Sequence, residues 1–149
     1  LVAVDPEPRA PLPAGVEHRP HLLGEGEVAL ADALGPGDVL FVDSSHLAVP
    51  GSDVDLLICR ILPRLASGVL LHLHDVFLPD AYPESWAWRG YNEQTVVAAL
   101  LLGSRFRPLW ASRWMATRRA ERIAAGPLSA LPLPPGAFET SLWLEVGGA

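Results

Sequence analysis

The chain has 149 residues, half of them hydrophobic, and a formal net charge of −6. This length allows one domain with its own core, and the composition excludes a disordered chain. The acidic balance argues against a nucleic-acid partner, and no apolar run approaches the roughly 20 residues that a membrane-spanning helix needs. The single cysteine, Cys59, excludes an internal disulfide and is expected in the core or at its boundary, in a protein of the cytoplasm.

The first third of the chain predicts short elements separated by turns. Residues 1–4 are an apolar, β-compatible run that ends in Asp5, and two prolines then break regular structure. Residues 17–23 are a second candidate strand, and residues 28–34 are long enough for about two helical turns. Because a natural domain rarely starts inside an apolar strand, we expect residue 1 to lie within the domain.

The centre of the chain predicts a strand, a helix and a second strand. Val39–Val42 and residues 69–73 are nearly unbroken apolar runs, as in strands that are covered on both faces. Between them, Ser52 and Asp55 have the spacing of a capping box, and Gly68 is a helix stop signal. The apolar residues of the helix recur at helical spacing: Val54, Leu57, Ile58, Ile61, Leu62 and Leu65. A unit of this length is a right-handed crossover between adjacent parallel strands.

Both of these strands end in clusters of ionisable side chains, which are Asp43, Ser44 and His46 after the first and His72, His74 and Asp75 at the second. The carboxyl ends of parallel strands meet at one edge of a sheet, so we expect the two clusters to face one crevice. His46 has a suitable intrinsic pKa for a general base, and Asp43 could orient it or bind a metal. The plainer alternatives are that Asp43 caps the following loop and that His72, in mid-strand, is a buried histidine with one hydrogen bond.

The last part of the chain predicts a loop, a helix and two more strands. Residues 76–90 are rich in aromatic residues and prolines, as in a lid over the crevice or a loop that packs its own aromatic rings. Asn92 can cap a helix that follows it. Pro108 would confine the strand Phe106–Ala111 to a sheet edge. Residues 141–146 alternate enough to form a last strand.

The segments DVLFVDSSH, GSDV, ILPRL, GVLLHLHDVFLP and YNEQ follow one another closely between Asp38 and Gly103. Together they resemble a family of class I S-adenosylmethionine-dependent methyltransferases. The resemblance implies an α/β fold with a doubly wound, Rossmann-like, mostly parallel sheet whose last strand is antiparallel. The first strand of that fold and its glycine-rich loop would precede residue 1. We therefore expect residues 1–149 to be a partial methyltransferase domain that lacks its first strand.

The resemblance also assigns cofactor and metal positions. Asp5 matches the acid that binds the cofactor ribose, and Glu25 lies in the turn near the adenine. Asp43 and Ser44 lie where the methionine end of S-adenosylmethionine meets the substrate. Some related O-methyltransferases bind a divalent cation such as Mg²⁺ through acids at the ends of these two strands. The matching candidates for metal ligands are Asp43, His74 and Asp75.

The implied function is methyl transfer from S-adenosylmethionine to the hydroxyl of a small molecule or sugar, with His46 and Asp43 as catalytic residues. Two alternatives remain open: a metal-dependent hydrolase that uses the cluster at residues 72–75, and a non-catalytic module for homo-oligomerisation. Because the glycine-rich loop of the family has no counterpart in the chain, we expect this chain on its own to bind S-adenosylmethionine weakly or not at all.

Overall fold

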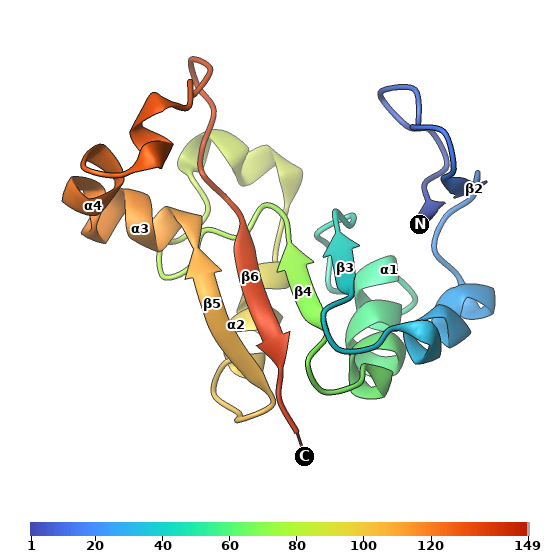
Figure 1. Ribbon diagram of the computed structural model, residues 1–149. Coiled ribbons are helices and arrows are strands. Elements are labelled where there is room, and N and C mark those ends of the chain that lie inside the picture. The colour runs from blue at the N-terminus through green and yellow to red at the C-terminus, as the bar shows by residue number, and fades with distance from the viewer. Residues whose placement is uncertain (149) are drawn as a thin grey trace.

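The strands and helices of the computed structural model, which describes residues 1–148, form a mixed α/β fold (Figure 1). A parallel pair is formed by β1 (Val2–Val4) and β2 (Glu17–Arg19). The larger sheet has the order β3-β4-β6-β5. Its strands are β3 (Val39–Val42), β4 (Leu70–Leu73), β5 (Phe106–Ala111) and β6 (Leu142–Val146). Among residues 1–148, no helix is both long and apolar enough to cross a membrane.

The predicted crossover unit is confirmed, because β3 and β4 are parallel neighbours with Val39 opposite Leu70. Three consecutive helical segments connect them, namely α1 (Asp53–Leu56), the π-helical turn η2 (Leu57–Ile61) and the 3-10 turn η3 (Leu62–Arg64). Ser52 caps α1 by accepting a hydrogen bond from the Asp55 amide at 3.1 Å. The Asp55 carboxylate does not complete the capping box. It accepts a hydrogen bond from the Gly51 amide at 2.9 Å instead.

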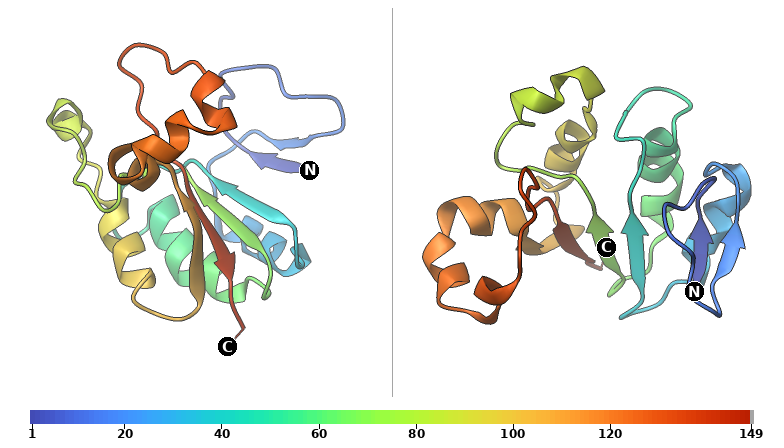
Figure 2. Two further views of the ribbon diagram at one scale, coloured as in Figure 1. Left: turned by 60° about the vertical axis from the view of Figure 1, so that its left-hand side comes forward. Right: turned by 90° about the horizontal axis from the view of Figure 1, so that it is seen from above.

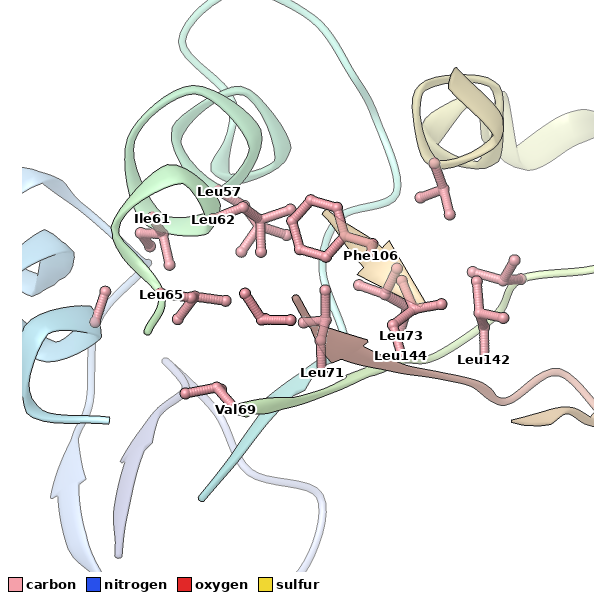
Figure 3. Close-up of a cluster of buried hydrophobic side chains, with 14 of the residues drawn as sticks. Leu57, Ile61, Leu62, Leu65, Val69, Leu71, Leu73, Phe106, Leu142 and Leu144 are labelled. Atoms are coloured by element: carbon pink, nitrogen blue, oxygen red, sulfur yellow. The ribbon is translucent and has the colours of Figure 1, made fainter. Parts of the chain in front are cut away.

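The main core lies between the crossover and one face of the larger sheet (Figure 3). Leu71 and Leu73 of β4 are almost completely buried there, and burial of one such side chain contributes about 1.5–3 kcal/mol. The opposite face is not covered in the same way, since Phe41 is 56% exposed. The expectation of strands covered on both faces is therefore wrong for β3. Cys59 is also exposed, because it lies on the side of the crossover opposite the buried Leu57.

Further helical segments lie outside the crossover. They are η1 (Glu25–Ala33), η4 (Glu84–Arg89), α2 (Glu93–Leu100), α3 (Ser112–Arg118), α4 (Ala120–Ala124) and η5 (Pro127–Ala130). Val97 of α2 is buried in the same core as the crossover. The last strand, β6, is antiparallel to both β4 and β5, as the resemblance implies. Its position leaves β5 at the edge of the sheet, as Pro108 predicts.

The strands do not form the single sheet that the resemblance implies. The β1–β2 pair lies on the β3 side of the larger sheet but is hydrogen-bonded into a sheet of its own (Figure 2). Consequently β3 is hydrogen-bonded to β4 on one side and presents an open edge on the other. Open edges leave backbone amide and carbonyl groups available to another strand.

Candidate functional site

The polar residues that follow β3 and β4 meet at the carboxyl ends of these strands, as parallel pairing requires. We call them, with one residue of α2, the His46 cluster, which comprises Asp43, Ser44, His46, His74, Asp75 and Glu93. His46 and Asp75 are the non-glycine residues with positive φ among those described, at 58° and 54°. Such conformations cost about 1–3 kcal/mol each and persist where the surrounding structure holds them, often at functional sites.

His46 is at the centre of the cluster and is only 3% exposed. Its Nδ1 is 2.8 Å from Glu93 Oε2. Its Nε2 is 3.3 Å from Asp43 Oδ1 and 3.8 Å from Asp75 Oδ2. The ring of Tyr91 packs against the imidazole with 4.5 Å between the ring centroids. Both nitrogens of His46 therefore face carboxylates.

These carboxylates decide the charge of His46. Burial alone would lower the pKa of the imidazole, but the hydrogen bonds with Asp43 and Glu93 outweigh it and raise the pKa of His46 to about 9. The neighbouring imidazoles of His46 and His74 hold the pKa of the Asp43 carboxyl well below its usual range. His46 is therefore an imidazolium at neutral pH and must lose its proton before it can act as a base.

His74 and Asp75 bring the end of β4 into the cluster. His74 Nδ1 lies 3.4 Å from Asp43 Oδ1 and 3.3 Å from Asp75 Oδ1. The Asp75 side chain is held by Thr140, whose hydroxyl donates to Asp75 Oδ1 at 3.1 Å. The predicted ligands Asp43, His74 and Asp75 are thus neighbours. The set whose ligand atoms all lie within 4.8 Å of one another is Asp43, His46 and His74.

Glu93 is the residue of the site that the sequence reasoning missed. It lies in the first turn of α2, is 2% exposed, and accepts hydrogen bonds at Oε2 from both His46 Nδ1 and the Ser44 hydroxyl, the latter at 2.9 Å. The positive end of the helix dipole favours a carboxylate there. Asn92, expected to cap this helix, instead accepts a hydrogen bond from the Ala48 amide at 2.6 Å. The loop after His46 is thereby tied to the start of α2.

The loop at residues 76–90 packs its own aromatic rings and also contacts the cluster. Phe77 lies edge-on to Tyr82 and Trp86, with centroid distances of 5.6 and 5.1 Å. Arg89 stacks over Trp86 at 4.1 Å and lies 4.0 Å from Asp75 Oδ2. Within residues 1–148, several buried polar atoms beside the cluster have no hydrogen-bond partner: His74 Nδ1, Tyr82 Oη, Arg89 Nε and Glu93 Oε1. Buried polar atoms usually have a partner, so this pattern is typical of a site that takes a ligand or an ion.

The other predicted site residues lie elsewhere in the fold. Asp5 follows β1 in the two-stranded sheet, where its Oδ1 accepts a hydrogen bond from the Glu7 amide at 2.8 Å. Glu25 is exposed and pairs with Arg60 at 3.1 Å. His72 stacks on Trp143 of β6 with 4.4 Å between centroids. Of the four predicted cofactor contacts, Asp43 and Ser44 therefore belong to the cluster, whereas Asp5 and Glu25 do not.

The half-exposed Asp43 carboxylate is the most accessible acid of the cluster, and both His46 and His74 face it. The Ser44 hydroxyl is already engaged with Glu93. Comparisons of the chain with protein-family models, curated proteins and solved structures found no match. The function is therefore argued from the site.

Proposed function

We propose that the protein is a methyltransferase of the doubly wound α/β class that transfers a methyl group from S-adenosylmethionine to a hydroxyl of a small molecule or sugar. The observation that supports this most is the buried pair of His46 and Glu93 at the carboxyl ends of two parallel strands. Ligands of open parallel sheets bind at those ends. The half-exposed Asp43 carboxylate stands beside the pair, where it would hold the amino group of the methyl donor.

The chemistry requires a base that is held in one orientation. As the acceptor oxygen forms its bond to the methyl carbon, the carbon–sulfur bond breaks and the acceptor must lose its proton. A hydrogen bond from His46 Nδ1 to Glu93 leaves Nε2 as the nitrogen that accepts this proton, once the imidazolium present at neutral pH has given up its own. Nε2 is directed toward Asp43 and Asp75, and therefore toward the strand ends where the substrates would meet.

The test is transfer of a labelled methyl group to a panel of sugars and phenols. Loss of a positioned general base lowers rates by about 100- to 10,000-fold, so His46→Gln should remove nearly all transfer. Glu93→Gln should reduce methyl transfer as well, because residue 93 then no longer fixes the nitrogen of His46 that carries the proton. His72→Gln is the matched control, since His72 is a neighbouring histidine outside the cluster and should keep its activity. Transfer that is absent from the wild type at millimolar S-adenosylmethionine, or unchanged in His46→Gln, would overturn the proposal.

A metal-dependent hydrolase is the second candidate, favoured by the close set of Asp43, His46 and His74. Two histidines and one acid also form the protein ligands of known zinc hydrolase sites. Zinc-dependent cleavage of p-nitrophenyl esters or phosphates, without any methyl transfer, would select this candidate. If the protein shows neither methyl transfer nor cleavage, the non-catalytic module is favoured.

A further inference from the structure

We propose that the loop at residues 76–90 and the start of α2 form a subsite for a sugar ring, in which Tyr82, Arg89 and Glu93 bind its hydroxyl groups. Three side-chain atoms of this region are buried and, within residues 1–148, have no hydrogen-bond partner: Tyr82 Oη, Arg89 Nε and Glu93 Oε1. An unpaired buried group costs about 1–3 kcal/mol, so three of them in one region indicate a place where a ligand binds.

Tyr91 brings these side chains together beside His46. The rings of Tyr82 and Trp86 lie 5.7 and 5.9 Å from the ring of Tyr91, measured between centroids. Arg89 Nη1 donates a hydrogen bond to Tyr91 Oη at 3.1 Å. The same ring of Tyr91 packs against the imidazole of His46 at 4.5 Å. The subsite is therefore continuous with the His46 cluster.

Glu93 and Tyr82 meet at the first turn of α2. Glu93 is 2% exposed, and its Oε2 is bonded to His46 and Ser44, so Oε1 is the acceptor that remains. The Tyr82 hydroxyl lies near the backbone amide of Gln94, the next residue along α2. Burial raises the pKa of Tyr82 to about 12, so its hydroxyl keeps its proton at neutral pH and can donate it in a hydrogen bond.

Arg89 is fixed by aromatic rings and keeps one donor unpaired. Its guanidinium lies over the rings of Trp86, Trp88 and Tyr91, at 4.1, 5.4 and 5.3 Å from their centroids. The faces of these rings attract the cation and so orient it. Nη1 is engaged with Tyr91 and faces Asp75 at 4.0 Å, whereas Nε has no acceptor among the described residues. Arg89 therefore presents a donor that is already positioned.

The mixture of donors and acceptors selects the kind of ligand. Arg89 Nε can only donate, Glu93 Oε1 can only accept, and Tyr82 Oη can do both. A hydroxyl group also does both, and a sugar carries several of them around one ring. A simple phenol has one hydroxyl, which methyl transfer requires at His46, so it would leave the other atoms unpaired; this step rests on the proposed function. Sites built to bind substrate hydroxyls strongly reject analogues that lack them.

The burial of these atoms also assigns a role to the loop at residues 76–90. Water does not reach the three atoms in this structure, so a ligand reaches them only when the loop lifts. We therefore expect the sugar to enter beneath the loop and the loop to close over it, as lids do in many enzymes.

NMR titration of the isotope-labelled whole chain, without S-adenosylmethionine, tests the subsite independently of any activity. The probes are the methyl pyranosides of glucose, galactose, mannose and rhamnose, with phenol and cyclohexanol as ring compounds that carry one hydroxyl. We expect saturable shifts at the amides of residues 76–94 with at least one pyranoside. Phenol and cyclohexanol should bind at least about 10-fold more weakly, because they leave hydrogen-bonding groups of the protein unpaired.

Tyr82→Phe keeps the ring and removes only the hydroxyl, so it should fold and should weaken pyranoside binding by about 10-fold. Arg89→Gln should weaken the binding by at least as much. Arg122→Gln is the matched control, because Arg122 is exposed on α4 and its replacement should leave pyranoside binding unchanged. The spectra of the variants without ligand check that each is folded.

The proposal is overturned if no pyranoside of the panel binds more tightly than cyclohexanol, or if Tyr82→Phe and Arg89→Gln bind pyranosides as the wild type does. The proposed function fails separately. Pyranoside binding without methyl transfer to the bound sugar would contradict the methyltransferase and support the subsite. Methyl transfer to a phenol without pyranoside binding would support the methyltransferase and overturn the subsite.

Discussion

At the scale of single residues, the candidate site depends on a buried histidine that is surrounded by acids. His46 contacts Glu93 on one side and Asp43 and Asp75 on the other. Its left-handed backbone conformation turns the side chain back toward the strand ends. A charged imidazole in this position stabilises the fold only while it keeps its proton, and this gives a prediction about pH.

In chelator-treated protein, the folded-state pKa of His46 of about 9 lies above its unfolded value of 6.5. The associated stability is fully present below pH 6.5 and is lost as pH rises through 9. Relative to His46→Gln, the wild type should lose up to about 3 kcal/mol of unfolding free energy over this range. Urea denaturation at a series of pH values measures the difference. If plots of unfolding free energy against pH stay parallel for the wild type and His46→Gln across this range, the assignment of a positive charge to His46 is contradicted.

At the scale of elements, the turn before β4 holds three parts of the fold together. Gly68 has a φ of +85°, donates its amide hydrogen to Val146 O at 2.7 Å, and accepts a hydrogen bond from the Gly37 amide at 2.8 Å. A Cβ atom at this position would lie 2.8 Å from Pro36 Cβ. The turn therefore requires glycine for both its conformation and its space.

Gly68→Ala should lower the unfolding free energy by about 3 kcal/mol, because a left-handed alanine and a steric overlap are both unfavourable. Gly136→Ala is the matched control. Gly136 also has a positive φ, of +78°, but a Cβ there has no neighbour within 4 Å. Its cost should be about 1 kcal/mol. Equal losses for the two variants in denaturant titrations would show that packing against Pro36 is unimportant.

The start of the crossover gives a smaller effect. Ser52 accepts the Asp55 amide hydrogen bond at the beginning of α1, and loss of such a cap costs about 1 kcal/mol. Ser52→Ala should therefore lower the denaturation midpoint, whereas Ser85→Ala, at an exposed position of η4, should change it little. A Ser52→Ala midpoint equal to that of the wild type would show that the cap contributes nothing.

The elements that could be predicted from sequence are those set by local patterns. The apolar runs, the helical spacing between them and the proline in β5 predict the strands β3 and β4, their crossover and the edge position of β5. Contacts between distant residues could not be predicted in this way. Glu93 joins His46 across 47 positions, and Asn92 bonds to Ala48 rather than to its own helix, because tertiary contacts override local capping preferences. The sequence signal that could have identified Glu93 was its position in YNEQ, one of the segments that carry the family resemblance.

At the scale of the whole molecule, the division into two sheets leaves the β3 edge open. Val39 and Phe41 point to the same side of this strand and are 46% and 56% exposed. An exposed, apolar edge strand is prone to pair with another chain. We therefore expect the protein to self-associate as its concentration rises.

Phe41→Lys should reduce this self-association in sedimentation-velocity measurements, because a charge on an edge strand disfavours pairing. Leu102→Lys is the matched control. Leu102 is 91% exposed but lies in the turn after α2, away from the edge. Self-association that is equally reduced by both substitutions would indicate a general effect of surface hydrophobicity instead.

The central claim is that the ends of β3 and β4 bind S-adenosylmethionine. Asp43 is held in the His46 cluster, but Asp5 belongs to the other sheet, so only part of the expected site is preorganised and binding should be weak, in the millimolar range. The most direct measurement is titration of the isotope-labelled protein with S-adenosylmethionine, followed by NMR. We predict saturable shifts at the amides of residues 43–46 that ATP does not reproduce. Absence of shifts there, or equal shifts with ATP, would contradict the claim.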